Sequence, residues 1–267
     1  MKTITSRSNE QIKYVANLQK DSHARYADEV YTVEGIRMSR ELPPESVLQL
    51  FISESFNKKN AAADIAGGVR NELITIVADD VFEKISSTKS PQGILALVKM
   101  PRYELSDLTR GGKGLLLLEE IQDPGNLGTI LRSAEAAGLG GVILDEKCAD
   151  IFSPKVVRST MGSIFRVPFI KTDSFAFAVS ALKENGYTIY AAHLDGEDIY
   201  SSNFSAKSAF LIGNEGNGLR RETSMLADKM IRIPMEGKVE SLNASIAASL
   251  LAFEWRAFRR TYEKRNT

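Results

Sequence analysis

The feature that most constrains the fold is a series of apolar runs in the second half of the chain, each leading into a helical or glycine-rich segment. The runs cover residues 115–119, 141–145, 166–170, 188–193, 209–213 and 230–234. A strand that is apolar along its whole length is typical of a sheet covered on both faces. The pattern therefore predicts an α/β fold with a mainly parallel sheet and helices on each side. Helices are expected to begin near Asn126, Ser153, Ser174, Leu219 and Asn243.

The first hundred residues show a similar alternation with shorter elements. Helical spacing of apolar residues covers 9–19, a short helix begins within 81–85, and strands are expected at 30–33, 48–52, 73–77 and 93–98. Residues 101–114 then combine proline, polar residues and several glycines, which is typical of a linker. The sequence of 267 residues is thus predicted to form a smaller α/β domain over 1–100, a linker over 101–113 and a second domain over 114–267.

Composition narrows the class of protein. With 43% apolar and 25% charged residues, the chain matches ordinary globular proteins and excludes disorder. No apolar run approaches the roughly 18 residues of a membrane span, and the beginning lacks the apolar segment of a signal peptide. A single cysteine, Cys148, cannot form an intrachain disulfide, and with only two histidines it cannot build a Cys/His zinc site. We expect a cytoplasmic protein without a metal and without membrane contact.

The charge balance is even overall and uneven locally. The chain has 34 basic and 34 acidic residues. Residues 1–40 hold seven basic and five acidic residues, and residues 255–267 hold five basic and one acidic residue. Such clusters are found on solvated helix faces and also on surfaces that bind phosphate backbones, and composition does not distinguish the two.

The first segment whose residues could take part in binding or catalysis is 123–138. Asn126 is expected to cap the start of a helix and Gly138 its end. The apolar stripe of this helix contains Leu127, Ile130, Leu131, Ala134 and Ala137. Arg132 lies off that stripe, on a helix that follows the carboxyl end of a strand, where open α/β sheets place their sites. It is either a solvated arginine or a site residue.

The second segment, 209–219, is an apolar strand that opens into Gly213, Gly216 and Gly218 with Asn214 and Glu215 between them. Glycines at a strand end permit close approach of a ligand or a positive φ. The order G-x-x-G-x-G differs from the dinucleotide fingerprint, and the Gly-Lys-Ser/Thr of a Walker loop is missing. A tight connection without a ligand is the alternative interpretation.

The third segment begins with a strand stopped by Pro234 and continues into a helix opened by Ser241, Asn243 and Ser245. The free N–H groups and polar side chains at a helix start can receive a ligand. The helix continues with apolar residues around most of its circumference, Leu250, Leu251, Phe253, Trp255 and Phe258. We expect its own sheet and a second subunit to cover it. The alternative is a helix buried within one subunit.

In this order and spacing, the three segments resemble the motifs of the SpoU (TrmH-like) RNA 2'-O-ribose methyltransferases of the SPOUT superfamily. The resemblance rests on Asn126 with Arg132, on residues 213–218, and on residues 233–235 followed by 241–245. Residues 25–40, with Val33-Glu34-Gly35, are similar to the ribosomal-protein-L30e-like substrate-binding domain that precedes the catalytic domain in many members.

The resemblance implies a C-terminal trefoil knot, a homodimer, and S-adenosylmethionine as the methyl donor. It assigns Asn126, Arg132 and Glu215 to catalysis. It assigns eight residues to the cofactor: Gly213, Asn214, Gly216, Ile233, Met235, Ser241, Leu242 and Asn243. Because arginine stays protonated, Arg132 is expected to bind the neighbouring phosphate and stabilise the developing alkoxide, while the proton leaves to phosphate or water.

The resemblance also makes the N-terminal domain the RNA-binding part, with Arg7, Arg25, Arg37 and Arg40 as candidate contacts. Ribosomal RNA is the expected substrate and transfer RNA the alternative. Other interpretations are an inactive RNA-binding assembly factor with the same fold and, from a different class, a nucleotide-dependent oxidoreductase or NTPase. His23 and His193 are left without a role, and Cys148 is expected to be a small buried residue.

Overall fold

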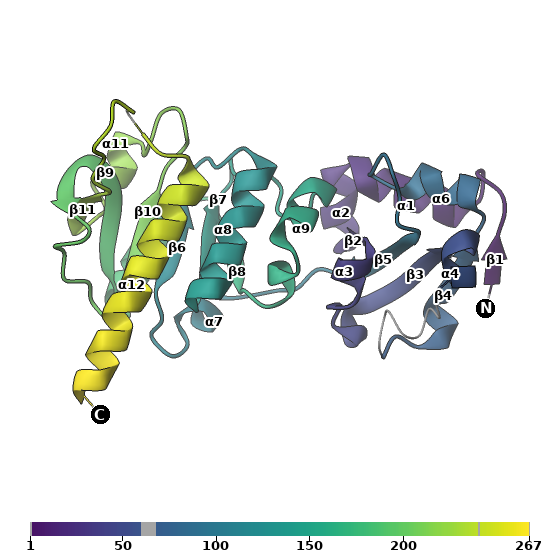
Figure 1. Ribbon diagram of the computed structural model, residues 1–267, viewed down its shortest axis with the longest axis horizontal. Coiled ribbons are helices and arrows are strands. Elements are labelled where there is room, and N and C mark those ends of the chain that lie inside the picture. Colours follow the sequence, from purple (N-terminus) through teal and green to yellow (C-terminus); the bar gives the residue numbers. More distant parts are fainter. Residues whose placement is uncertain (1, 60–67, 240, 267) are drawn as a thin grey trace. The chain divides into compact units, whose positions relative to one another are not determined.

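The structure, a computed structural model, describes residues 2–59, 68–239 and 241–266, and it divides into two compact units (Figure 1). The first unit comprises Met1–Pro101 and Asp150–Phe165. The second comprises Arg102–Ala149 and Arg166–Thr267. Each unit has its own sheet and its own hydrophobic core.

These units differ from the predicted domains in two places. The segment 101–113, expected as a linker, contains helix α7 (Leu105–Thr109), and Leu108 is fully buried in the core of the second unit. Residues 150–165, predicted within the second domain, pack with the first unit. The ring centroids of Phe152 and Tyr31 lie 4.9 Å apart. This contact buries the aromatic side chain of Phe152 against the first unit, where it would otherwise be exposed to water.

The first unit contains a mixed five-stranded sheet in the order β1-β4-β3-β5-β2. Its strands are β1 (Lys2–Ile4), β2 (Val30–Glu34), β3 (Val47–Ser53), β4 (Ile74–Val77) and β5 (Ile94–Lys99). The first three in spatial order are parallel, and β5 runs antiparallel to both of its neighbours. The helices are α1 (Glu10–Lys20), α2 (Ser22–Asp28), α3 (Ile36–Ser39), α4 (Glu54–Lys59), α6 (Asp79–Ile85) and α9 (Pro154–Thr160), with 3-10 turns η1 (Pro44–Ser46), η2 (Asn71–Leu73) and η3 (Ser163–Phe165).

Arg25 lies inside the first unit and not on its surface. Its side chain is 4% exposed, it pairs with Asp150 at 2.5 Å between Nη2 and Oδ2, and it donates to the carbonyl oxygen of Leu18 at 2.5 Å. The Tyr26 hydroxyl donates to the same carboxylate at 3.0 Å. The prediction that Arg25 contacts RNA is therefore wrong, because its guanidinium is already paired out of reach of solvent.

The second unit contains a six-stranded, fully parallel sheet in the order β11-β9-β10-β6-β7-β8. Its strands are β6 (Leu115–Leu118), β7 (Gly141–Asp145), β8 (Phe169–Thr172), β9 (Thr188–Asp198), β10 (Ser208–Ile212) and β11 (Lys229–Arg232). The parallel sheet with helices on each side is confirmed. Its helices are α7, α8 (Pro124–Ala137), α10 (Phe175–Glu184), α11 (Arg221–Ser224) and α12 (Ala244–Asn266).

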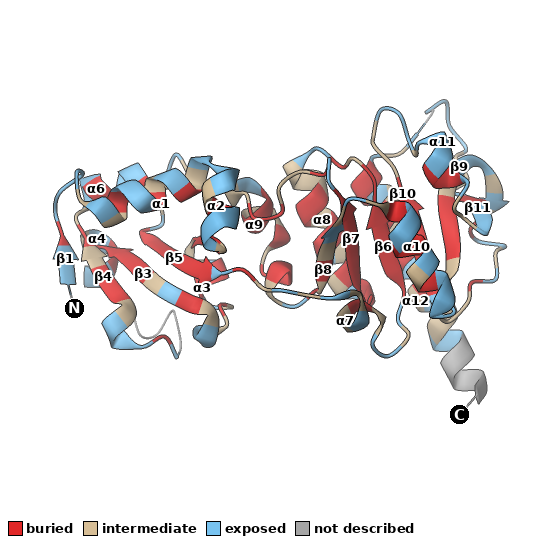
Figure 2. Cartoon of the chain, turned by 180° about the vertical axis from the view of Figure 1, so that it is seen from behind, coloured by how far each residue is buried: buried red, intermediate tan, exposed pale blue. Residues whose placement is uncertain are grey.

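Helices cover both faces of this sheet (Figures 1 and 2). Helices α7 and α10 pack on one face through Leu108 and Leu182, in a cluster with side chains of β6, β9 and β10. On the other face, α12 packs against α8 and β10. Within the part of the chain that the structure describes, no helix is both long enough and apolar enough to cross a membrane.

The caps of α8 correct one expectation and confirm another. Asp123 caps the helix, since its Oδ1 accepts from the backbone N–H of Asn126 at 2.9 Å, and Pro124 occupies the first position. Asn126 was expected as the cap and instead lies in the first turn. A proline fits the first turn, where its missing N–H has no partner to lose. Gly138 ends the helix with φ 73°, as predicted.

We predict that Asp150→Ala lowers the free energy of unfolding by about 3 kcal/mol, because it leaves the Arg25 guanidinium buried without its counter-charge. Urea unfolding followed by circular dichroism measures the change. The control is Glu72→Ala, which removes the exposed partner of Arg70 and should change the free energy by less than about 1 kcal/mol. Similar small changes in both variants would contradict the prediction.

Candidate active site

A cavity of about 360 Å³ lies at the carboxyl ends of β10 and β11 and beside the middle of β9. Seven of the eight residues predicted to bind a cofactor line it, namely Gly213, Asn214, Gly216, Ile233, Met235, Ser241 and Leu242. The sequence had not indicated several others: Ala192 and Leu194 in β9, Leu219, and Ala247 and Leu251 on α12. His193 also lines the cavity, and its Nδ1 accepts from the backbone N–H of Asp195 at 3.3 Å.

The loop after β10, residues 213–219, folds back on itself around the side chain of Asn214. Its Oδ1 accepts from the backbone N–H groups of Gly216 at 2.8 Å and Asn217 at 3.2 Å. Its backbone carbonyl accepts from Gly218 at 2.9 Å. Asn214 therefore shapes the wall of the cavity from within the loop.

Two glycines of this loop have separate requirements. A Cβ at Gly213 would lie 2.2 Å from the carbonyl carbon of Gly218, so no side chain fits there. Gly218 has φ 66°, the left-handed region that favours glycine. Gly213 is therefore needed because the backbone of Gly218 and Leu219, in the same loop, packs closely against it.

Asn126 joins three segments that are far apart in the sequence. Its Nδ2 donates to Oε1 of Glu215 at 2.5 Å, and its Oδ1 accepts from Nδ2 of Asn243 at 3.0 Å. Asn243 does not line the cavity. Its Oδ1 accepts from the backbone N–H and hydroxyl of Ser245, which opens α12. The loops after β6, β10 and β11 thus meet at one amide group.

Arg132 lies apart from this group of residues. It is exposed, it does not line the cavity, and no residue in the described ranges forms a hydrogen bond or ion pair with its side chain. Arg132 follows Asn126 by six residues, which turns it about 120° around the helix axis. The structure therefore brings Asn126 and Glu215 together and leaves Arg132 outside.

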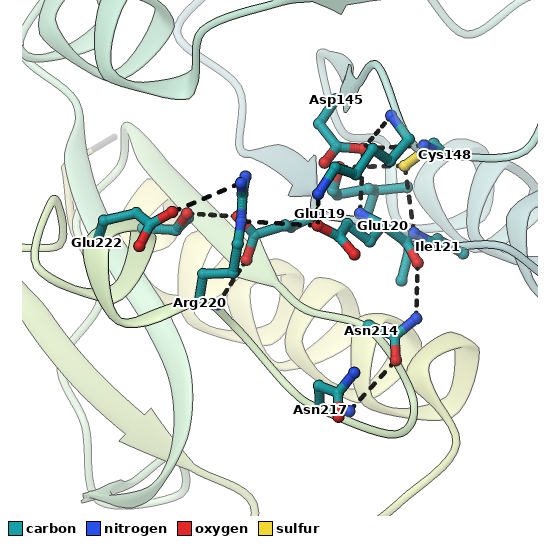
Figure 3. A network of polar contacts seen from close by, with 12 residues as sticks. Glu119, Glu120, Ile121, Asp145, Cys148, Asn214, Asn217, Arg220 and Glu222 are labelled. Atoms are coloured by element: carbon teal, nitrogen blue, oxygen red, sulfur yellow. Dashed lines mark hydrogen bonds and ion pairs between the residues drawn. The ribbon is translucent and has the colours of Figure 1, made fainter.

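The polar network in Figure 3 ties the loop after β10 to the end of β6. Glu119, 1% exposed, accepts from the backbone N–H of Arg220 at 2.7 Å and from its Nε at 2.7 Å. The Glu119 carboxylate raises the pKa of the Arg220 guanidinium further above its usual value. Asn214 adds a second tie, because its Nδ2 donates to the carbonyl oxygen of Glu120 at 2.9 Å. Both ends of the loop are therefore held by the turn after β6.

The same turn is held from its other side by Asp145, the last residue of β7, and by Cys148 in the turn that follows. Oδ1 of Asp145 accepts from the backbone N–H groups of Glu120 at 3.1 Å and Cys148 at 2.9 Å. Sγ of Cys148 accepts from the N–H of Ile121 and donates to the carbonyl oxygen of Leu118. Burial, together with the charge of Asp145, raises the pKa of this thiol to about 12. Cys148 is buried, as expected, and it stays protonated at neutral pH.

Glu120 shows how tightly this turn is held. Its φ is 54°, a conformation that a residue with a side chain rarely adopts. Its carboxylate pairs with Lys147 at 2.7 Å, which lowers its pKa. Sequence reasoning missed the network of Glu119, Glu120, Asp145 and Arg220, because the partners come from strand ends that only the folded sheet brings together.

The predicted RNA contacts are all in the first unit. Arg7 is exposed, and its Nε pairs with Asp80 at 3.2 Å. Arg37 and Arg40 are exposed, and within the described residues neither side chain forms an ion pair. These three arginines remain candidates, in contrast to Arg25.

The lining of the cavity fits the nucleoside part of S-adenosylmethionine. The volume is within the roughly 300–1,000 Å³ of small-molecule sites. Apolar side chains such as Ile212, Ile233 and Leu242 provide faces for an adenine ring, and the backbone of the glycine loop provides polar groups. Among the described residues, no group of three or more His, Cys, Asp or Glu side chains is placed to hold a metal ion.

Comparisons with known families divide the chain in two close to residue 100, and they place residues 150–165 with the second part. Residues 113–253 match the SpoU rRNA Methylase family. Residues 9–96 match the MRM3-like substrate binding domain. The two matches fall mainly in the second and the first unit, respectively.

Individual relatives are similar along nearly the whole chain. The 23S rRNA (guanosine(2553)-2'-O)-methyltransferase RlmP of Bacillus subtilis is 30% identical over 259 residues, which cover 96% of this chain and 100% of the relative. An AdoMet-bound rRNA methyltransferase from Sinorhizobium meliloti has a TM-score of 0.82 at 30% identity, covering 96% and 97% of the two chains. The SpoU methyltransferase AviRb from Streptomyces viridochromogenes, in complex with AdoMet, has a TM-score of 0.83 at 26% identity, covering 95% and 99%.

We predict that Gly213→Ala raises the Kd for S-adenosylmethionine by about tenfold or more, because the added methyl group forces the loop around Asn214 to open. The matched control is Gly216→Ala in the same loop. There the nearest atom to the new Cβ is Asn214 Oδ1 at 3.4 Å, so the loop should stay closed. Isothermal titration calorimetry measures both. Equal affinities would show that the loop geometry does not determine binding.

Proposed function

The chain belongs to the SpoU rRNA methylase family, and we propose on this basis that it transfers the methyl group of S-adenosylmethionine to the 2'-hydroxyl of a ribose in ribosomal RNA. The observation that carries the proposal is the convergence of three loops on one cavity through the side chain of Asn126. Two of the candidate catalytic residues, Asn126 and Glu215, are neighbours of the candidate cofactor residues, whereas Arg132 lies outside the cavity of its own chain.

We infer that the backbone around Gly213, Ile233 and Leu242 holds the adenosine part of the cofactor, which supplies an activated methyl group when bound. Met235 and Ser241 complete the lining. Asn126 is a positioning residue in this account, because both of its amide atoms are already used by Glu215 and Asn243. It fixes the loop after β10 relative to the start of α12.

Arg132 acts on the RNA side of the reaction. As the ribose 2'-oxygen forms its bond to the methyl carbon and the carbon–sulfur bond breaks, the oxygen must lose its proton. A permanently charged guanidinium suits the binding of the adjacent phosphate and the stabilisation of the developing alkoxide. The proton leaves to phosphate or to water.

The position of Arg132 supports a homodimer in which the arginine of one protomer serves the cavity of its partner. Arg132 is exposed and lies outside the cavity of its own chain. On the neighbouring helix α12, Ile246 is 51% and Phe253 50% exposed. These two side chains are seven residues apart and share one helix face, which gives a second subunit an apolar surface to cover.

Two further features are part of the proposal. We propose that the chain between β10 and α12 is threaded as a trefoil knot, supported by membership of the family and by the shared cavity of the two loops after β10 and β11. We also propose a cytoplasmic location, supported by the ribosomal RNA substrate.

The function is tested by incubating the protein with radiolabelled S-adenosylmethionine and with in vitro transcribed 23S rRNA or transfer RNA in parallel. We expect label in the 23S rRNA, as a 2'-O-methylated nucleotide resistant to alkaline hydrolysis. RlmP of Bacillus subtilis is named for guanosine 2553, and the equivalent nucleotide is the first to examine. Label found only in transfer RNA would show that transfer RNA is the substrate. A protein that binds S-adenosylmethionine but transfers no label to either RNA would support the role of an assembly factor.

We predict that Arg132→Lys lowers kcat at saturating RNA by about 10²-fold, since an ammonium lacks the planar fork that grips a phosphate. The Kd for S-adenosylmethionine should stay unchanged, because Arg132 does not line the cavity. Single-turnover methylation and calorimetry measure the two quantities. Turnover near that of the unmodified protein would refute the assigned role.

A mixing experiment tests the shared site. At an S-adenosylmethionine concentration well below the raised Kd of the Gly213→Ala variant, this variant and Arg132→Ala are each expected to be nearly inactive alone. If the arginine of one protomer serves the cavity of the other, half of the randomly mixed dimers contain one intact site, which restores about a quarter of the full activity. Co-refolded mixtures are compared with each variant alone. No recovery, with mixed dimers shown by native mass spectrometry, would place Arg132 at the cavity of its own chain.

A further inference from the structure

A buried carboxylate organises a loop in the first unit, far in the sequence from the residues of the cavity. Glu34, at the end of β2, is 5% exposed. Its Oε1 accepts from the hydroxyls of Ser86 at 2.5 Å and Thr88 at 3.0 Å, and its Oε2 accepts from the N–H and hydroxyl of Ser87 at 2.9 and 2.8 Å. Four donors from three consecutive residues therefore converge on one side chain.

This arrangement fixes the shape of the loop between α6 and β5. Removing a carboxylate from water is unfavourable unless hydrogen bonds replace the lost hydration. Among the described residues the replacement comes from residues 86–88, so the loop cannot change its shape without leaving the charge of Glu34 unsatisfied. A hydrophobic side chain at the same place would fill the space without imposing this geometry.

The loop is tied to two other segments. The backbone N–H of Ile36 donates to Oε1 of Gln92 at 2.8 Å, which connects the loop to α3. Nη1 of Arg158, on α9, donates to the hydroxyl of Ser87, which connects the loop to α9. Arg37, Lys89 and Arg158 each belong to a different segment, and each is within three residues of one of these contacts.

The three segments are also unusual in charge. Residues 35–40, 84–92 and 154–160 contain no acidic residue and six basic ones, Arg37, Arg40, Lys84, Lys89, Lys155 and Arg158. The whole chain has as many acidic as basic residues. In the described part of the chain, the carboxylate that accepts hydrogen bonds from this loop is that of Glu34, which is buried. The three segments that meet around this carboxylate therefore carry a net positive charge.

We propose that the Glu34 surface, defined by Arg37, Lys89 and Arg158 around the loop 86–92, binds the phosphate backbone of the RNA substrate. The inference rests on the proposed function and names the part of the first unit that holds the RNA. Because the hydroxyls of Ser86, Ser87 and Thr88 are used by Glu34, the surface offers cations and few groups that could read a base. It therefore positions the RNA independently of its sequence.

The main test removes two exposed cations whose side chains form no hydrogen bond or ion pair among the described residues. The double variant Arg37→Gln/Lys89→Gln is compared with Lys2→Gln/Lys13→Gln, which removes two exposed charges elsewhere on the first unit, one on the edge strand β1 and one on α1. Filter binding to in vitro transcribed 23S rRNA is measured over a series of KCl concentrations, alongside methylation by the unmodified protein.

We expect the Arg37/Lys89 variant to bind the RNA about tenfold or more weakly. Its salt dependence should be less steep, by about 0.7–0.9 for each phosphate that the variant no longer neutralises. Its Kd for S-adenosylmethionine and its kcat at saturating RNA should be unchanged. A binding curve and salt slope that coincide with those of the Lys2/Lys13 variant would overturn the proposal. If the unmodified protein transfers no methyl group to any RNA, the proposed function fails, and this is separate from the comparison of the two variants.

The Glu34→Gln variant distinguishes the effect of loop shape on RNA binding from the effect of surface charge. This substitution removes a negative charge under the surface, so attraction by charge alone would strengthen RNA binding. If the carboxylate shapes the loop, binding weakens in spite of the added net charge. Thermal unfolding establishes that the variant is folded. Tighter binding by a folded Glu34→Gln variant would contradict the assigned role of Glu34, and an unfolded variant leaves the Arg37/Lys89 comparison to decide the proposal.

Discussion

The second unit depends on one geometric constraint, which is that parallel strands end at the same edge of a sheet. The turns after β6, β10 and β11 are therefore forced together, although they are separated by about a hundred residues in the sequence. At their meeting point the Asn126 amide uses its donor for Glu215 and its acceptor for Asn243. An amide suits this place because a carboxylate or an ammonium would satisfy only one of the two partners. The cavity is the space that these joined loops enclose.

The strands were predicted well from the sequence where buried apolar side chains alone determine their position. The predicted strand at 141–145 agrees with β7 at both ends, and those over β6 and β10 differ by a residue or so. By contrast, β9 continues to Asp198, well beyond the predicted residue 193. Its second half is largely exposed and polar, and an apolar run cannot reveal such a strand. The motif residues directly follow apolar strands that the sequence reveals, so most of the predicted cofactor residues do line the cavity.

Residues whose roles depend on a distant partner could not be predicted. Arg25 and Arg37 look alike in the sequence, yet Arg25 is buried because Asp150, 125 residues away, lies beside it. The pair of Glu119 and Arg220 spans 101 residues and was missed, and so was the group of hydroxyls on Glu34. In each case the partner is supplied by the arrangement of the strands, and spacing within a motif contains no information about it. In the proposed homodimer, Arg132 would extend the same limit to a second subunit.

Hydrogen exchange measured by mass spectrometry on the full chain, with and without S-adenosylmethionine, tests the central claim that separate loops close around one methyl donor. We predict that the donor slows exchange in peptides covering residues 213–219 and 233–243 together, and leaves peptides of β1 to β5 in the first unit unchanged. Protection in only one of the two loops, or in the first unit instead, would contradict the account.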